Sequence, residues 1–210
     1  MAKQEHPLEG LQRFLPPNTF EGVIPYLQQY PVHLTLTRHR ETRLGDYRAP
    51  TRQEPYHRIS VNATLNCYSF LITLLHEIAH LTTHIHHTRN VSPHGKEWKL
   101  EFQKVLIPFL GKNIFPQPVE QALQAYLRNP AASTCTDARL YKALAKFDVR
   151  DEGLLHADEI AIGAIFELSG RRFEKLENLR TRIRCKDTDT GKIYLVAGVA
   201  QVKPLPKNSY

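Results

Sequence analysis

Two histidines and one glutamate lie in an otherwise apolar stretch of the chain, and their spacing is typical of a metal site. They are His76, Glu77 and His80, in the segment LLHEIAH. On an α-helix, residues four apart project from the same face, about 6 Å apart along the axis, so both imidazoles can bind one ion. Glu77 can then take a proton from a water molecule on that ion. This pattern, HExxH, predicts metal-assisted hydrolysis.

The apolar neighbours of the motif favour a metal site over a chance match. A buried polar group without a partner costs about 1–3 kcal/mol, and an unpaired charge costs more. A divalent cation would offset that cost for two imidazoles and a nearby carboxylate. The chain contains 11 histidines, so a chance match is the alternative. The surrounding apolar residues, which would pack the other faces of the helix, argue against it.

A catalytic zinc needs a third protein ligand and an open fourth position for water. The candidates downstream are His84, His86, His87 and His94. His84 would lie about another 6 Å along the helix, too far to share the ion, and His86 and His87 fall where the helix should end. His94 opens a new helix after a Pro-containing loop, so the chain can fold back, and Gly95 permits close backbone approach. His94 is therefore the favoured third ligand.

The segment LLHEIAHLTTHIHHTRNVSPHGKEWK resembles the SprT-like zinc metalloprotease family, which has the SprT/Spartan type of zincin domain. In that family, HExxH is followed about fourteen residues later by a His-Gly pair and then by an aromatic residue. Here these residues are His94, Gly95 and Trp98. The resemblance extends over about residues 10–130 and is specific at the motif.

The resemblance implies a minimal zincin fold and one catalytic Zn²⁺. It implies that the zinc ligands are His76, His80 and His94 and that Glu77 is the general base. It also implies the substrate class, which is proteins bound or crosslinked to DNA. Trp98 is expected to pack the helices around the site. Asn62 could line a substrate cleft.

Hydrophobic spacing predicts the elements that would position this site. A central helix is expected from Cys67 to about His87. Further helices are expected at 8–15, 20–30, 94–110 and 119–127, and strands at 32–40, 56–66 and, more weakly, around 43–50. Residues 1–130 are therefore expected to form an α+β, minimal zincin-like domain with a small three-stranded sheet.

Residues 131–210 are expected to form a linker and a basic, mainly β C-terminal region. The polar, Pro-containing segment 128–137 favours a linker, and a short helix follows it. Beyond it come short strands and tight turns, of which DTDTG at 187–191 is the clearest. Many SprT-like proteins carry a zinc ribbon with cysteine pairs at this end. Only Cys135 and Cys185 occur here, so a ribbon-like set of hairpins without zinc is expected.

Positive charge gathers in the same region. The net charge is +7, and residues 169–210 contain ten Lys or Arg against four Asp or Glu, a balance of +6. Alternation places Arg180, Arg182 and Arg184 on one face of a strand, where they could contact phosphates. Leu179 and Cys185 would lie on the inner face. A DNA partner is therefore predicted, with a merely solvated edge as the alternative.

The remaining sequence features argue against a membrane span and against export, and two alternative functions stay open. The apolar run Phe70 to Leu75 is far shorter than the roughly 20 residues of a membrane helix. The N-terminal MAKQEHPLEG has no signal-peptide core, and three cysteines without a CxxC pair suit a reducing compartment, so a cytoplasmic location is expected. The main rival is a non-proteolytic, zinc-containing, DNA-associated regulatory protein. The second is a peptidase indifferent to DNA.

Overall fold

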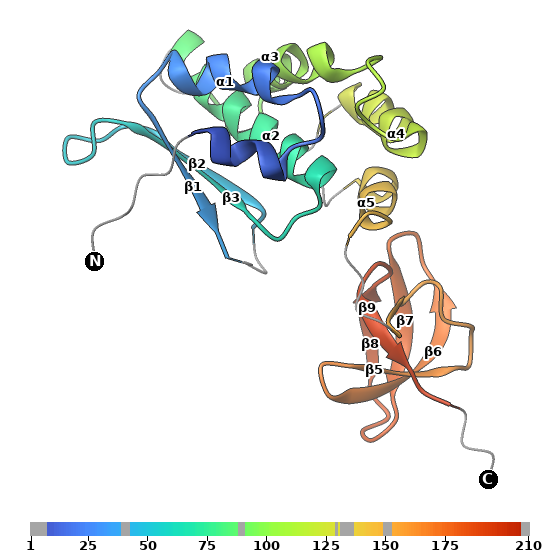
Figure 1. Cartoon of the computed structure of the whole chain (residues 1–210). Helices are drawn as coiled ribbons and strands as arrows, with labels where there is room; N and C mark the ends of the chain where they lie inside the picture. The colour runs from blue at the N-terminus through green and yellow to red at the C-terminus, as the bar shows by residue number, and fades with distance from the viewer. Residues whose placement is uncertain are drawn as a thin grey trace. The chain divides into compact units, whose positions relative to one another are not determined.

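The computed structural model describes residues 8–38, 43–87, 91–128, 130, 137–148 and 153–206. The chain divides into two compact units, residues 1–147 and residues 148–210 (Figure 1). Cys135 and most of the expected linker lie outside the described residues. Among the residues that are described, no helix has both the length and the apolarity needed to cross a membrane.

The first unit is a mixed α+β structure, as expected. Its elements are η1 (Leu8–Phe14), α1 (Phe20–Gln28), β1 (Val32–Thr37), β2 (Gly45–Arg48), β3 (His57–Asn62), α2 (Cys67–His86), α3 (Lys96–Leu106), η2 (Ile107–Phe109), α4 (Gln117–Leu127) and α5 (Ala138–Ala145).

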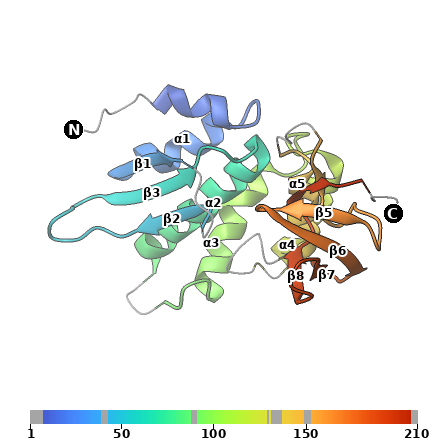
Figure 2. The same cartoon turned by 90° about the horizontal axis from the view of Figure 1, so that it is seen from below.

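The three strands form one sheet in the order β1-β3-β2, which Figure 2 shows side by side. β3 is parallel to β1 and antiparallel to β2. Its side chains Ile59 and Val61 are buried and join the core of the unit. β2 is the strand that the sequence pattern predicted most weakly. It is the edge strand beside β3 and packs on α2.

Helix α2 runs through the core, with the sheet on one side and α3 on another (Figure 1). Asn66 begins it, because the Asn66 side chain accepts a hydrogen bond of 3.0 Å from the amide of Ser69. Almost every residue from Ser69 to Thr83 is buried. A helix that is buried on all sides can hold polar residues only where they have partners.

The boundary between the units differs from the one expected at residue 130. Helix α5, expected in the C-terminal region, packs against α4 and belongs to the first unit. Leu140 and Leu144 are buried in the core of this unit. The Asn66 side chain also donates a hydrogen bond of 3.2 Å to the carbonyl of Leu144. Burial of one face of α5 therefore extends the first unit to residue 147.

The second unit is a six-stranded sheet. Its strands are β4 (Leu155–His156), β5 (Ile165–Leu168), β6 (Arg171–Asn178), β7 (Arg182–Asp187), β8 (Ile193–Ala197) and β9 (Gln201–Pro204), in the order β4-β9-β5-β6-β7-β8. All of the neighbouring pairs are antiparallel. The core contains Phe166, Phe173, Ile183 and Cys185, so Cys185 is a core residue as expected.

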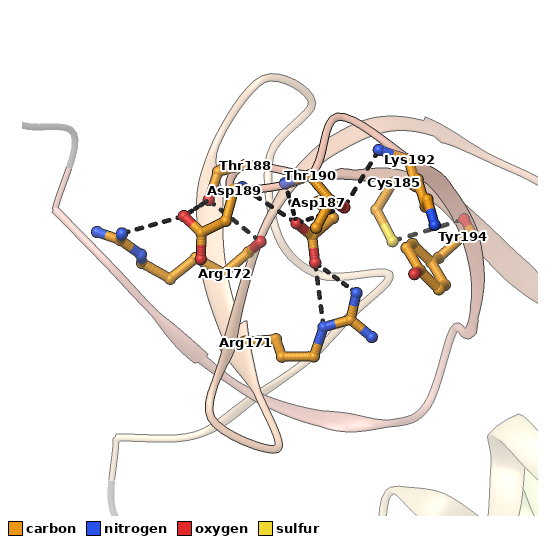
Figure 3. A network of polar contacts seen from close by, with 9 residues as sticks. All are labelled: Arg171, Arg172, Cys185, Asp187, Thr188, Asp189, Thr190, Lys192 and Tyr194. Carbon is orange, nitrogen blue, oxygen red and sulfur yellow. Dashed lines mark hydrogen bonds and ion pairs between the residues drawn. The ribbon is translucent and has the colours of Figure 1, made fainter.

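The expected DTDTG turn joins β7 to β8. The buried carboxylate of Asp187 accepts hydrogen bonds from the Thr190 amide at 2.7 Å and the Thr190 hydroxyl at 2.9 Å. It also forms an ion pair with the guanidinium of Arg171 (Figure 3). This guanidinium lies over the rings of Phe173 and Tyr194. The Arg171 side chain is thus held in place by the Asp187 carboxylate and by the two aromatic rings.

Candidate metal centre

Helix α2 carries three of the predicted site residues. His76 and Glu77 are buried, at 8% and 6% exposure, and His80 is half-buried. Because His76 and His80 are one turn apart, their rings lie close together on the helix surface, with centroids 5.1 Å apart. The HExxH residues therefore lie on one continuous helix, as their spacing predicted.

His94 reaches the same place from a reversal of the chain before α3. Its backbone has φ +58°, in the left-handed region where non-glycine residues are uncommon, although His enters it more readily than most. Gly95 then caps α3, and a Cβ built there would lie 2.9 Å from the Ser92 carbonyl oxygen. The turn needs this glycine because the backbone folds tightly on itself, and the turn brings His94 back to α2.

The three imidazoles converge through their Nε2 atoms. His94 Nε2 lies 3.1 Å from His76 Nε2 and 3.0 Å from His80 Nε2. Burial, with the neighbouring imidazoles, lowers the pKa of His76 to about 3 and that of His80 to about 4, and burial lowers the pKa of His94. Neutral rings have one lone pair each. Three of them at one point form a donor set that could hold a metal ion.

Two aromatic side chains of α3 pack behind the imidazoles. The ring centroid of Trp98 is 4.6 Å from that of His76 and 4.7 Å from that of His94. Phe102 stacks on Trp98 at 5.1 Å. Both are fully buried, so Trp98 packs the helices around the site, as expected. These contacts limit the rotation of the imidazoles.

The other candidate histidines lie outside this group. His84 is exposed, and its ring lies 5.6 Å from that of His57 on β3. His86 and His87 contact the buried carboxylate of Glu101, at 3.1 Å and 3.5 Å. No sequence pattern marks Glu101 as the partner of both histidines, because a glutamate at this position of α3 looks like an ordinary solvated one.

Sequence reasoning also missed residues of the sheet beside the site. The Tyr47 hydroxyl on β2 lies 2.9 Å from His57 Nδ1 on β3. The Tyr47 ring lies nearly parallel to the His80 ring, with centroids 6.2 Å apart, and burial raises the pKa of Tyr47 well above its usual value. A weak edge strand offers no pattern that marks these residues.

Asn62 does not face a cleft. Its side chain is fully buried, accepts a hydrogen bond of 2.9 Å from the Thr37 hydroxyl and donates one of 3.3 Å to the Arg43 carbonyl. Asn62 therefore ties β3 to β1 and to the segment before β2. Its role in the described structure is to hold the sheet together.

The three arginines predicted to share a face are only partly together. Arg182 and Arg184 lie on the exposed face of β7, whereas Arg180 lies in the bend before the strand begins. Leu179, expected inside, is 43% exposed for the same reason. Arg184 forms an ion pair of 3.1 Å with Glu177 on β6. The alternation held only within the strand, since period-two alternation ends where pairing ends.

Comparison with known families covers the region of this site. The family model described as the SprT-like family matches residues 20–114, from α1 to beyond η2. Comparisons with curated proteins and with solved structures gave no match. The matched region contains the three histidines that converge here, His76, His80 and His94, and it also contains Glu77. Over residues 20–114, this chain is therefore similar to the SprT-like family.

Proposed function

We propose that the protein is a zinc-dependent metalloprotease of the SprT-like type. One observation carries the proposal: the Nε2 atoms of His76 and His80 lie 3.1 Å and 3.0 Å from His94 Nε2, and Glu77 is on the same helix as His76 and His80. The match of residues 20–114 to the SprT-like family model supports it.

The donor set fits a catalytic zinc better than a structural one. Three imidazoles with an open fourth position are a common catalytic zinc site, whereas structural sites have four protein ligands. Within the described residues, the metal-holding group contains His76, His80 and His94 and no fourth histidine, cysteine or carboxylate. This arrangement disfavours the non-proteolytic rival, which would be expected to close the site.

The residues around the centre have separate tasks in the proposed reaction. Bound zinc would supply Lewis-acid chemistry, which polarises the scissile carbonyl and makes water more acidic. Glu77 takes a proton from the attacking water and passes it to the leaving amine. His76, His80 and His94 hold the ion, and Trp98 packs behind their rings and keeps water from that side.

The test separates metal binding from proton transfer. Glu77→Gln keeps the shape of the side chain but removes its basicity, so this variant should retain one zinc and lose at least about 100-fold in peptide cleavage. His80→Ala should lose both zinc and cleavage. Glu21→Gln, the same change on the exposed side of α1, is the matched control. Undiminished cleavage by Glu77→Gln would remove Glu77 from the mechanism.

We further propose that the substrates are proteins bound or crosslinked to DNA. The family resemblance and the basic C-terminal region support this class. The test is cleavage of a DNA-binding protein with and without single-stranded DNA. Stimulation by DNA that requires Glu77 supports the proposal. Equal cleavage without DNA would favour a general peptidase, and zinc and DNA binding with no cleavage would favour the regulatory rival.

A further inference from the structure

Gly45, the first residue of the edge strand β2, lies directly against the side chain of Glu77. A Cβ built on Gly45 would be 2.5 Å from Glu77 Oε1 and 2.9 Å from Glu77 Cγ. It would also be 2.8 Å from Cγ2 of Thr73, one turn earlier on α2. Carbon atoms do not normally approach other heavy atoms this closely, since optimal separations are about 3.5–4.0 Å. The space of a side chain at position 45 is therefore occupied by Glu77 and Thr73.

The backbone of β2 does not itself require glycine at this position. Gly45 is absent from the described glycines with positive φ, which are Gly111, Gly153, Gly163, Gly170 and Gly191. It pairs with Val61 in the regular antiparallel register between β2 and β3. Any L-residue could adopt this extended conformation. The missing side chain therefore serves close approach between β2 and α2, not a turn.

We infer that Gly45 is a positioning residue for Glu77, an inference that rests on the proposed function. The β2 backbone at Gly45 packs closely against Oε1 and Cγ of Glu77, whose side chain is buried at 6% exposure. A glutamate side chain has three rotatable bonds, and the β2 backbone on one side sterically excludes some of its rotamers. The strand thereby limits where the carboxylate can lie relative to the three imidazoles on α2 and before α3.

The inference predicts a specific defect in Gly45→Ala. The new methyl group would displace the carboxylate, which is the free end of a flexible side chain, while the zinc ligands come from α2 and the turn before α3. This variant should keep one zinc and a KM within about twofold. Its kcat should fall by about 10- to 100-fold, since a displacement of about 1 Å can cost that much.

A double-variant comparison tests whether Gly45 acts through Glu77. Glu77→Asp shortens the side chain by one methylene, which withdraws it from the methyl group. Gly45→Ala should then lower kcat by less than about threefold in the Glu77→Asp background. Gly10→Ala is the matched control, because a Cβ there would meet its nearest atom, in Arg13, at 3.7 Å. Full kcat in Gly45→Ala, or independent multiplication of the two losses, overturns the inference.

A second measurement does not depend on catalysis. In metal-free protein, Gly45→Ala should lower the urea midpoint of unfolding, and Glu77→Ala should remove about half or more of that decrease. Thr73 accounts for the remainder. An equal decrease in both backgrounds overturns the inference even if the enzyme is active. A wild-type protein without peptidase activity overturns the proposed function, while these midpoints still decide whether Gly45 sets the place of Glu77.

Discussion

At the scale of single residues, His94 completes the candidate metal centre from a backbone conformation that costs energy. Left-handed φ in a non-glycine residue persists where the surrounding structure enforces it, and such residues often lie at functional sites. The His94 Nε2 atom is the one that approaches both His76 and His80. The third ligand position therefore depends on the turn before α3.

We expect His94→Ala to weaken zinc binding by at least about 100-fold, because it removes one of three donors. Competition with a chromophoric chelator measures the affinity. His84→Ala, a histidine deletion on the same helix outside the metal group, is the control and should bind zinc like the unchanged protein. Equal affinity of the two variants would exclude His94 as a ligand.

Lys175 is a buried charged residue of the second unit. Its side chain is fully buried, and Nζ donates hydrogen bonds to the carbonyls of Ala157, Asp158 and Ile160, at 3.1, 2.9 and 2.5 Å. Three carbonyls around one ammonium compensate for its loss of water. The hydrogen bonds of Lys175 thus connect the centre of β6 to the segment that follows β4.

Lys175→Met should destabilise this unit by about 2–4 kcal/mol, because three carbonyls lose their donor. Urea unfolding measures the change, and hydrogen exchange at residues 157–160 locates it. Lys186→Met, the same substitution on the exposed face of β7, should leave stability within about 0.5 kcal/mol. An equally small effect at Lys175 would show that water can replace the ammonium.

At the scale of elements, Glu101 joins the end of α2 to α3 near the turn that delivers His94. Its carboxylate, 2% exposed, contacts His86 and His87 after the motif and Lys104 on its own helix. Burial alone would raise the pKa of Glu101, but hydrogen bonds from Lys104, His86 and Thr82 outweigh it and hold the pKa at about 2. The charged carboxylate therefore stabilises the helix pair.

The sign of the pH dependence follows from that lowered pKa. Since the folded protein binds this proton less tightly than the unfolded chain, the stabilisation is complete above about pH 4.5 and is lost as the pH falls toward 2. Glu101→Gln should cost about 1–3 kcal/mol at pH 7 and progressively less below pH 4.5. Denaturant unfolding at several pH values, with the exposed Glu9→Gln as control, measures this. A constant deficit down to pH 3 would contradict it.

At the scale of the whole molecule, residues 169–210 contain ten Lys or Arg against four Asp or Glu, but several of these cations already form ion pairs. Arg171 and Arg172 bind Asp187 and Asp189, and Arg184 binds Glu177. In the described part of the chain, Arg182 and Lys186 on the exposed face of β7 have no ion pair. These two cations are the stronger candidates for phosphate contacts.

Arg182→Glu should weaken binding to single-stranded DNA by about 3- to 10-fold and reduce the salt dependence of binding, because a phosphate contact releases a counterion. Fluorescence anisotropy at two or more salt concentrations measures both. Lys112→Glu makes the same charge change on the first unit and is the control. An equal loss in both variants would indicate a general charge effect, and no loss would leave the DNA proposal without this contact.

The sequence alone determined the parts of the protein that depend on local periodicity. Three features could be predicted because residues close together in the chain form their patterns. They are the apolar helix with HExxH, the glycine after His94 and the alternating strand β7. The α+β class of the first unit, with its three-stranded sheet, followed from the order of such elements. Arg180 was misplaced because a strand's end depends on its partner strand.

Only the tertiary structure decided which distant residues meet. Several contacts join segments that are far apart in the chain. His94 Nε2 approaches the two helix histidines, and Gly45 lies against Glu77. Glu101 contacts the end of α2, and α5 packs in the first unit. Such contacts arise from close packing of buried surfaces, to which every side chain's shape contributes. A single sequence shows which residues could be buried, whereas packing selects their partners.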